Sequence, residues 1–366
     1  MFSTPRILRR LNLTLLLAVP VLGVILVPHW TGNLLINRAI AQDQQCSSWR
    51  KGNLELADRQ AKDPKKRSRI YSIAFNPDGA FLAVGNYDKK VEVWEVSKLW
   101  TSKAAKRPKV ALDFPRGEIL TVNFSPNGTI LASGGGNGII KVWNWQREVT
   151  MLTLTKHSKA VPSVLFSPDG QFLISGSRDQ TVKIWNLKTG AISGGWTENE
   201  EIQKLALSPD GRTLAVSLGG GEIQFRDWQT GNSIGEIGKS KTPMYLISDM
   251  AFSPDGKTLA FSPYSAPIAQ QPNQVCFWNL QSNQLEQCLS GHTAKVSSLA
   301  FSPDGHCLIS GSFDRSVKVW RVASRQLAYD SIENLDSVFS VAFSPNGRSF
   351  ARGSADGSFN VLRYKQ

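Results

Sequence analysis

Histidine is scarce in this chain, and the residue patterns that metal and nucleotide chemistry require do not occur. The 366 residues include four histidines, and there is no His-Glu-x-x-His, Cys-x-x-Cys or glycine-rich phosphate-binding motif. No helical pattern of membrane-spanning length occurs after residue 70. These absences speak against the common metalloenzyme, redox and nucleotide-binding classes, and we expect no cofactor, no metal site and no catalytic residues.

Cysteine is limited to four residues, Cys46, Cys276, Cys288 and Cys307. Cys276 and Cys288 flank a polar turn, so they are expected on neighbouring outer strands with Cβ atoms about 4.5–5.5 Å apart. A disulfide between them is geometrically feasible. The commoner alternative is a pair of buried, unpaired cysteines. The sequence leaves this pairing open.

Acidic residues are few in the first third, so the positive charge is unevenly spread. The net charge is +13, and residues 1–116 hold 20 Lys and Arg against 9 Asp and Glu. Residues 117–366 hold 22 against 20 and are close to neutral. A nucleic-acid binder would carry its basic charge over the folded domain, and no nucleic-acid partner is expected.

What the chain has in quantity is a repeat. Each unit is an apolar strand, a Pro-Asp-Gly or Pro-Asn-Gly turn, a second strand, another turn and a third strand with alternating side chains, as in Phe301–Trp320. In six of the seven units the third-strand position lies 15 residues after the turn glycine, and the fifth unit is longer. The turn glycines are Gly79, Gly128, Gly170, Gly211, Gly256, Gly305 and Gly347.

These units resemble WD repeats, and the Ser-Gly-Ser-x-Asp and Lys-Val-Trp phrases favour that family over the Asp-Gly repeats of other bacterial propellers. The resemblance implies an all-β fold: a seven-bladed, bacterial-type β-propeller of four-stranded antiparallel blades over residues 70–366. Because each such blade has four strands and the chain stops after a third strand, something within residues 53–60 is expected to supply the last outer strand.

The resemblance also implies a hydrogen-bond set that ties a loop to a strand within a blade. Two units carry all four members: His157, Ser175, Asp179 and Trp185, then His292, Ser310, Asp314 and Trp320. A Ser-His-Asp group also resembles a catalytic triad. Its nearly complete recurrence at the same spacing favours a structural role, because an active site is not built twice by a structural period.

The N-terminal 41 residues are predicted to be a signal peptide or a membrane anchor. Arginines precede an apolar run from Leu11 to Val27, and Ala39-Ile40-Ala41 fits a cleavage site. Either interpretation places the propeller in an extracytoplasmic compartment, such as a periplasm or lumen. Residues 42–69 read as a polar, basic linker, which either contacts anionic lipid or is simply solvated.

The leading functional hypothesis is a non-catalytic scaffold that binds protein partners, built on a monomeric propeller. Two insertions, at 98–109 and 262–274, lengthen loops, and the second is expected on the face where such propellers bind partners. Candidate partner-binding residues are Tyr87, Arg178, Phe313 and Tyr264. The alternative is a propeller enzyme, or a small-ligand or metal binder, that uses the central channel. The first strands place Ser and small apolar residues there, which argues against it.

Overall fold

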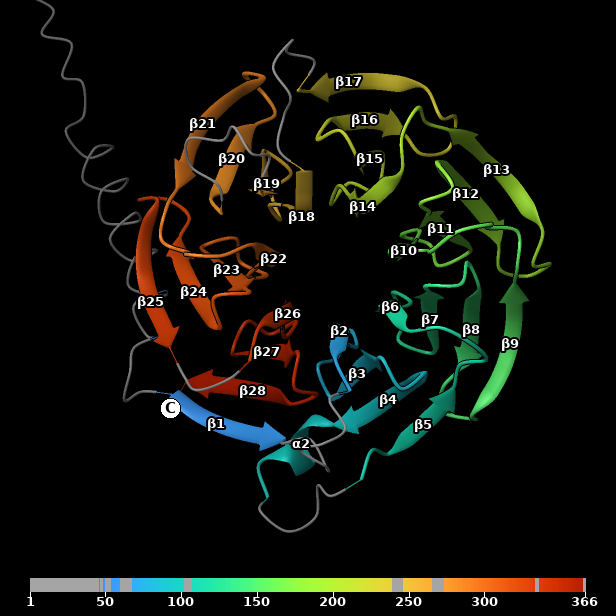
Figure 1. Ribbon diagram of the computed structural model, residues 1–366, viewed down its shortest axis with the longest axis horizontal. Helices are drawn as coiled ribbons and strands as arrows, with labels where there is room; N and C mark the ends of the chain where they lie inside the picture. Colours follow the sequence, from blue (N-terminus) through green and yellow to red (C-terminus); the bar gives the residue numbers. More distant parts are fainter. Residues whose placement is uncertain are drawn as a thin grey trace, which may run out of the picture.

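A computed structural model describes residues 46, 49, 54–59, 68–101, 107–238, 246–264, 273–332 and 336–364. These residues form seven four-stranded sheets set radially around an axis (Figure 1). All neighbouring strands within the sheets pair antiparallel where a register is given. The seven-bladed propeller predicted from the repeat is confirmed.

The blades are numbered here in the order of their turn glycines. The innermost strands are β2 (Ile70–Phe75), β6 (Ile119–Phe124), β10 (Ser163–Phe166), β14 (Ile202–Leu207), β18 (Leu246–Phe252), β22 (Val296–Phe301) and β26 (Val338–Phe343). The second strands are β3 (Phe81–Asn86), β7 (Ile130–Gly135), β11 (Phe172–Gly176), β15 (Thr213–Leu218), β19 (Thr258–Tyr264), β23 (Cys307–Ser312) and β27 (Ser349–Ser354).

The third strands are β4 (Lys90–Glu95), β8 (Ile140–Asn144), β12 (Thr181–Asn186), β16 (Ile223–Asp227), β20 (Val275–Asn279), β24 (Ser316–Arg321) and β28 (Phe359–Tyr364). The outer strands are β1 (Leu54–Arg59), β5 (Val110–Asp113), β9 (Val149–Leu154), β13 (Ile192–Thr197), β17 (Ser233–Ile237), β21 (Gln284–Leu289) and β25 (Gln326–Ile332). A short helix, α2 (Val96–Leu99), lies between β4 and β5.

The turn between first and second strands also joins neighbouring blades. In blade 6 the Gly305 φ is +74°, a conformation that glycine adopts without strain. The backbone N–H of His306 donates to the Asp304 carboxylate at 2.9 Å, which fixes the turn. A Cβ at Gly305 would lie 3.4 Å from Cδ of Pro254, the turn proline of blade 5. The turns of neighbouring blades therefore lie in van der Waals contact around the ring, and the positive φ is what favours glycine at this position.

The apolar core lies between adjacent sheets and not along the axis. Between blades 5 and 6, Val275 and Phe277 pack with Val296, Leu308 and Trp320, all 2 % exposed or less. Each fully buried side chain of this size contributes about 1.5–3 kcal/mol relative to an exposed one. A blade therefore depends on its neighbours for most of its buried surface.

Blade 7 is completed by a strand from the other end of the sequence. β1 pairs antiparallel with β28, with Leu54 opposite Tyr364 and Leu56 opposite Leu362. Figure 1 shows β1, in blue, beside β28, in red. This is the closing strand expected within residues 53–60, and it covers an edge that would otherwise expose unpaired backbone groups.

A disulfide fastens the segment before β1 to blade 6. Cys46 is bonded to Cys307, 261 residues away in the sequence. Trp49 is 2 % exposed and packs edge-on or tilted against three rings at centroid distances of 5.0–5.9 Å. No sequence pattern predicts this pairing, because Cys46 lies outside the repeats and its position relative to Cys307 cannot be counted from them.

The pair that the sequence left open is also a disulfide. Cys276 on β20 lies directly opposite Cys288 on β21, with Cα atoms 4.0 Å apart. The predicted signal peptide or anchor, residues 1–41, and most of the predicted linker lie outside the described residues. So do 102–106 and 265–272, the central parts of the two insertions.

Candidate partner-binding face

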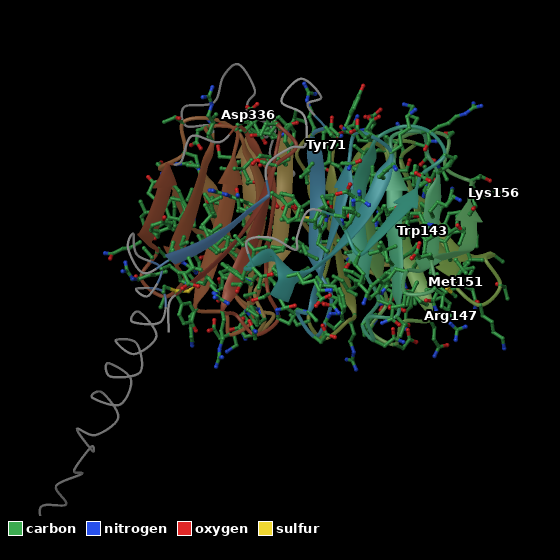
Figure 2. The ribbon with its side chains drawn as sticks, turned by 90° about the horizontal axis from the view of Figure 1, so that it is seen from below. Tyr71, Trp143, Arg147, Met151, Lys156 and Asp336 are labelled. Carbon is green, nitrogen blue, oxygen red and sulfur yellow. A yellow bond between two sulfur atoms is a disulfide. The ribbon has the colours of Figure 1, made fainter. Side chains whose placement is uncertain are left out.

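A recurring irregularity in the first strand of the blades positions side chains at one mouth of the central channel. In blade 1, Ile70 pairs with Asn86 and Ser72 with Gly85, so Tyr71 is an extra residue between them. Phe339 has the same place in blade 7. Bulges of this kind turn a side chain away from the regular strand direction. Viewed from the side, Tyr71 and Asp336 lie at one face of the disc and Arg147 at the opposite face (Figure 2).

The bulged residues begin a chain of aromatic rings that we call the aromatic arc: Tyr71, Phe339, Phe313 and Tyr264. The Tyr71 and Phe339 ring centroids are 5.2 Å apart, and those of Phe339 and Phe313 are 4.9 Å apart, both edge-on. Lys295 bridges the remaining gap, with Nζ 3.7 Å from the Tyr264 centroid and 5.7 Å from that of Phe313. The arc therefore runs over blades 1, 7, 6 and 5.

Three cations lie at this mouth. Burial lowers the pKa of the half-buried Lys295 ammonium, and the charge of Arg178 lowers it further. Arg178 also acts on the pKa of Tyr264, although burial is the larger effect there and raises it. A hydrogen bond to Tyr71 raises the pKa of the exposed Arg69 guanidinium. Cations from blades 1, 3 and 6 thus share the mouth with the aromatic arc.

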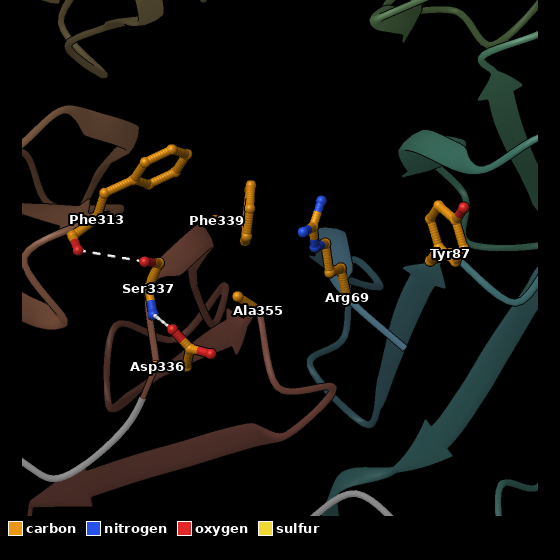
Figure 3. Close-up of a pocket in the computed structure, with 7 residues that line it drawn as sticks. All are labelled: Arg69, Tyr87, Phe313, Asp336, Ser337, Phe339 and Ala355. Atoms are coloured by element: carbon orange, nitrogen blue, oxygen red, sulfur yellow. Dashed lines mark hydrogen bonds between the residues drawn. The ribbon is translucent and has the colours of Figure 1, made fainter. Parts of the chain in front are cut away.

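A pocket of about 550 Å³ opens beside the arc. Figure 3 shows Phe313 and Phe339 on one side, the Arg69 guanidinium in the middle and Tyr87 on the other side. The remaining lining residues are Asp336, Ser337 and Ala355. The Asp336 carboxylate accepts a hydrogen bond from the Ser337 backbone N–H at 2.7 Å. A cation flanked by rings can bind a charged group and the carbon chain that carries it.

The four residues predicted to bind partners surround this mouth. Tyr87 and Phe313 line the pocket, and the Tyr87 side chain is 53 % exposed. Tyr264 and Phe313 hold Lys295 between them. Arg178 is exposed and acts electrostatically on Lys295 and Tyr264.

Sequence reasoning missed Arg69, Lys295, Tyr71 and Phe339. A signal for two of them was present, because in six blades of the described structure a residue just before the first strand accepts a hydrogen bond from the residue before the second turn. The Tyr87 N–H donates to the Arg69 carbonyl, and the Phe313 N–H to that of Lys295, both at 2.9 Å. Once a residue before a turn Asp is chosen, the residue preceding the first strand belongs to the same site.

Polar side chains on the strands around the central channel are used in contacts between blades. Five first-strand side chains, equivalent in position, each accept a hydrogen bond from a backbone N–H of the next blade at 2.8–3.2 Å. The acceptors are Ser72, Ser163, Asp249, Ser298 and Ser340. Asp249 is also paired with Lys204 at 3.1 Å. These contacts join the blades and give no separate argument for a ligand on the axis.

The four-residue sets of blades 3 and 6 form closed hydrogen-bond chains. Trp185 Nε1 donates to Ser175 Oγ at 2.8 Å, and Ser175 Oγ lies 2.7 Å from His157 Nε2. His157 Nδ1 lies 2.9 Å from Asp179, which also accepts the Ser158 N–H at 3.0 Å. Blade 6 repeats the three side-chain contacts at 2.8, 2.7 and 2.8 Å.

The protonation states follow from these contacts. Burial lowers the pKa of the His157 imidazole and Asp179 opposes this, so the ring is neutral at pH 7. Burial raises the pKa of the Asp179 carboxyl, but hydrogen bonds from Thr181, Ser158 and His157 outweigh it, and that pKa lies well below its ordinary value. The charged Asp179 fixes the proton on Nδ1. Ser175 is fully buried and occupied by Trp185, so it is not accessible as a nucleophile.

Comparison with known families finds matches to the WD domain, G-beta repeat, at residues 63–95, 109–144, 148–186, 283–321 and 331–361. The unmatched stretch covers blades 4 and 5. The periodic tryptophan protein 2 homolog of Neurospora crassa is 49% identical over 45 residues, 12% of this chain and 5% of that protein. Its Schizosaccharomyces pombe counterpart is 39% identical over 51 residues, 14% of this chain and 6% of that protein. The matches thus cover a small fraction of the length of these relatives.

The extracytoplasmic location expected from residues 1–41 is wrong by this comparison. Both relatives are periodic tryptophan protein 2 homologs, and this similarity points away from such a location. The expectation depended on hydropathy and flanking arginines alone. Those properties report how a segment partitions into an apolar phase, and they do not report where the folded propeller works. Within the described ranges, no helix is both long and apolar enough to cross a membrane.

Three independent observations agree on the family. Seven four-stranded blades follow the repeat period, and five stretches match the family's repeat. Two blades carry the His, Ser, Asp and Trp contacts that the resemblance implied. The chain belongs to the WD-repeat family.

Proposed function

We propose that this protein is a non-enzymatic scaffold that binds a protein partner at the channel mouth carrying the aromatic arc. The observation that supports this most directly is the gathering of exposed or half-buried rings and cations from five blades at one face. Aromatic and arginine side chains in a concave, partly desolvated setting are the usual anchors of protein interfaces. Family membership agrees with an interaction role but does not identify the partner.

A photo-crosslinking side chain at position 313 tests the proposal. In extract of cells that express the protein naturally, we expect crosslinks to a partner from position 313 but not from position 285, an exposed site on β21 at the perimeter. In pull-downs from the same extract without the crosslinking side chain, alanine at Tyr87, Arg178, Phe313 and Tyr264 together should abolish capture.

The matched control replaces four exposed apolar residues on outer strands with alanine: Val149, Ile192, Ile234 and Leu327. This control should retain capture, because those residues lie at the perimeter and not at the mouth. Capture that survives the mouth variant, or that is lost equally in the control, would refute the proposal.

A further inference from the structure

The three mouth cations have no carboxylate within ion-pair distance in the described part of the chain. Eight ion pairs join Lys or Arg to a carboxylate there, for example Arg226 to Glu198 at 2.6 Å and Lys159 to Glu201 at 3.1 Å. Arg69, Arg178 and Lys295 take part in none of these. The Arg69 guanidinium hydrogen-bonds Tyr71 and is acted on by the Asp336 charge, whereas Lys295 lies over Tyr264 and is repelled by Arg178.

The Lys295 ammonium lies in an electrostatically unfavourable environment. Its ammonium lies over Tyr264 and near Phe313, and a ring face is a weaker partner for a cation than a hydrogen-bonded carboxylate. Burial and the positive charge of Arg178 both act against the charged form. An anion bound at this point would relieve both effects, because it would restore a polar partner and screen the repulsion.

Asp336 is the carboxylate among the residues that line the pocket, and its Oδ1 is engaged by the Ser337 N–H. Its charge acts on the Arg69 guanidinium, and the described residues place no other acid in the pocket.

Acids lie at the mouth in blades 2 and 4, on either side of Arg178 in blade 3. The residues equivalent to Tyr87 and Phe313 in these two blades are Gly136 and Gly219. A Cβ at Gly136 would be 2.6 Å from the Glu118 carboxylate, and one at Gly219 would be 3.5 Å from that of Glu200. The acids of blades 2 and 4 would repel a negatively charged ligand, and the cations beside the aromatic arc would attract it. Such a ligand therefore has one preferred binding position at the mouth.

We propose that the occupant is an extended acidic segment of the partner protein, with carboxylates at Arg69 and Lys295 and its carbon chain against Phe313 and Phe339. This inference rests on the proposed function and specifies the chemistry of the partner. Guanidinium and ammonium groups bind carboxylates through charge-assisted hydrogen bonds, and Arg69 lies in the same pocket as the two rings. A peptide is favoured over a nucleic acid because Glu118 and Glu200 interrupt the three cations around this mouth, which leaves no continuous basic track for a phosphate backbone.

The test uses a synthetic peptide of alternating Glu and Leu, labelled with a neutral dye, and fluorescence anisotropy with the full chain. We expect binding that weakens with added salt. A peptide with Gln in place of every Glu should bind about tenfold more weakly or worse, because it lacks the charge-assisted bonds. Arg69→Gln with Lys295→Gln should weaken binding of the Glu peptide by a similar factor.

The matched control is Arg147→Gln with Lys188→Gln, which also removes two positive charges. Arg147 lies at the opposite face (Figure 2), and Lys188 is exposed in the equivalent turn of blade 3, between the third and outer strands. It should leave the affinity within about twofold, because the removed charges are distant and screened. Equal binding of the Glu and Gln peptides, no binding of the Glu peptide, or tighter binding of an oligothymidylate would overturn the inference. If crosslinking from position 313 persists when both mouth cations are removed, the scaffold function stands and only the acidic partner is refuted.

Discussion

Blade 3 and blade 2 differ in what surrounds one buried serine of the second strand. In blade 3, Ser175 accepts the Trp185 indole N–H at 2.8 Å and contacts His157 at 2.7 Å. In blade 2 the serine at the same register position is Ser133, and Pro115 stands where the histidine would be. Within the described residues the Ser133 hydroxyl has no hydrogen-bond partner. The second-strand serine therefore links loop to strand only where the preceding loop supplies a histidine.

Blade 4 also joins its preceding loop to its third strand, but it does so through an ion pair. Arg226 stands where blades 3 and 6 have tryptophan, and Glu198 accepts from its Nε at 2.6 Å and from its Nη2 at 2.9 Å. The Trp196 indole N–H donates to the same carboxylate at 2.7 Å. A link between loop and strand is thus retained in blade 4, although its residues differ from those of blades 3 and 6.

Blade 7 has neither arrangement and depends on a covalent fastening. Its outer strand β1 follows a segment that the Cys46–Cys307 disulfide ties to blade 6. Replacing both cysteines with serine removes a closed loop of 261 residues, worth about 5 kcal/mol by chain entropy, against about 3 for Cys276–Cys288. Thermal unfolding should show the larger decrease in Tm for the first pair. An equal or reversed order would show that β1 holds blade 7 without the disulfide.

Glu198→Ala should lower the free energy of unfolding by nearly as much as loss of the Cys46–Cys307 disulfide does. The variant leaves the Arg226 guanidinium and the Trp196 indole without their acceptor, and the Glu198 side chain is only 4 % exposed. Breaking one side of a buried ion pair costs about 3–5 kcal/mol. The double variant with Leu at both 198 and 226 should recover much of this loss, measured by urea unfolding. No recovery would mean that the charges are not what the single variant disrupts.

Replacing the second-strand serine with alanine in blade 2 and in blade 3 tests whether the two serines contribute differently to stability. Ser175→Ala should cost about 1–3 kcal/mol, because it leaves buried polar groups of Trp185 and His157 unmatched. Ser133→Ala should change the free energy of unfolding by less than about 0.5 kcal/mol or stabilise the protein, because that hydroxyl bonds nothing in the described chain. Equal losses in urea unfolding would show that the two serines differ less than their contacts indicate.

The smallest expected effect is a pH dependence from blade 3. Since burial lowers the folded pKa of His157 below its ordinary 6.5, its contribution is complete above that pH and is lost as the pH falls through the lower folded value. The free energy of unfolding should therefore decline from about pH 7 towards pH 5. His157→Gln should flatten this slope while lowering stability at neutral pH. An unchanged slope in the variant would place the titration elsewhere.

Much of the fold could be predicted because it is periodic. Gly305 and its equivalents each require a positive φ at the same place in every unit, so the number of blades could be counted directly. The closing strand Leu54–Arg59 was found by counting strands and not by its own pattern. The four-residue sets could be placed because their spacing is set by one antiparallel sheet.

The site was predicted less completely. Tyr87, Arg178, Phe313 and Tyr264 were chosen because they lie at or beside the second turns, and they do surround one mouth. Tyr71 and Phe339 were missed because their direction depends on a bulge, and a bulge is a register event between two strands with no residue type of its own.

The number of blades, the turn geometry and the hydrogen-bond sets can be inferred from the residues, because each depends on positions close together in one repeat. The Cys46–Cys307 bond and the convergence of Arg69, Arg178 and Lys295 on one mouth become visible only in the folded molecule. Those contacts join blades far apart in the chain, and their geometry exists only once the ring has closed.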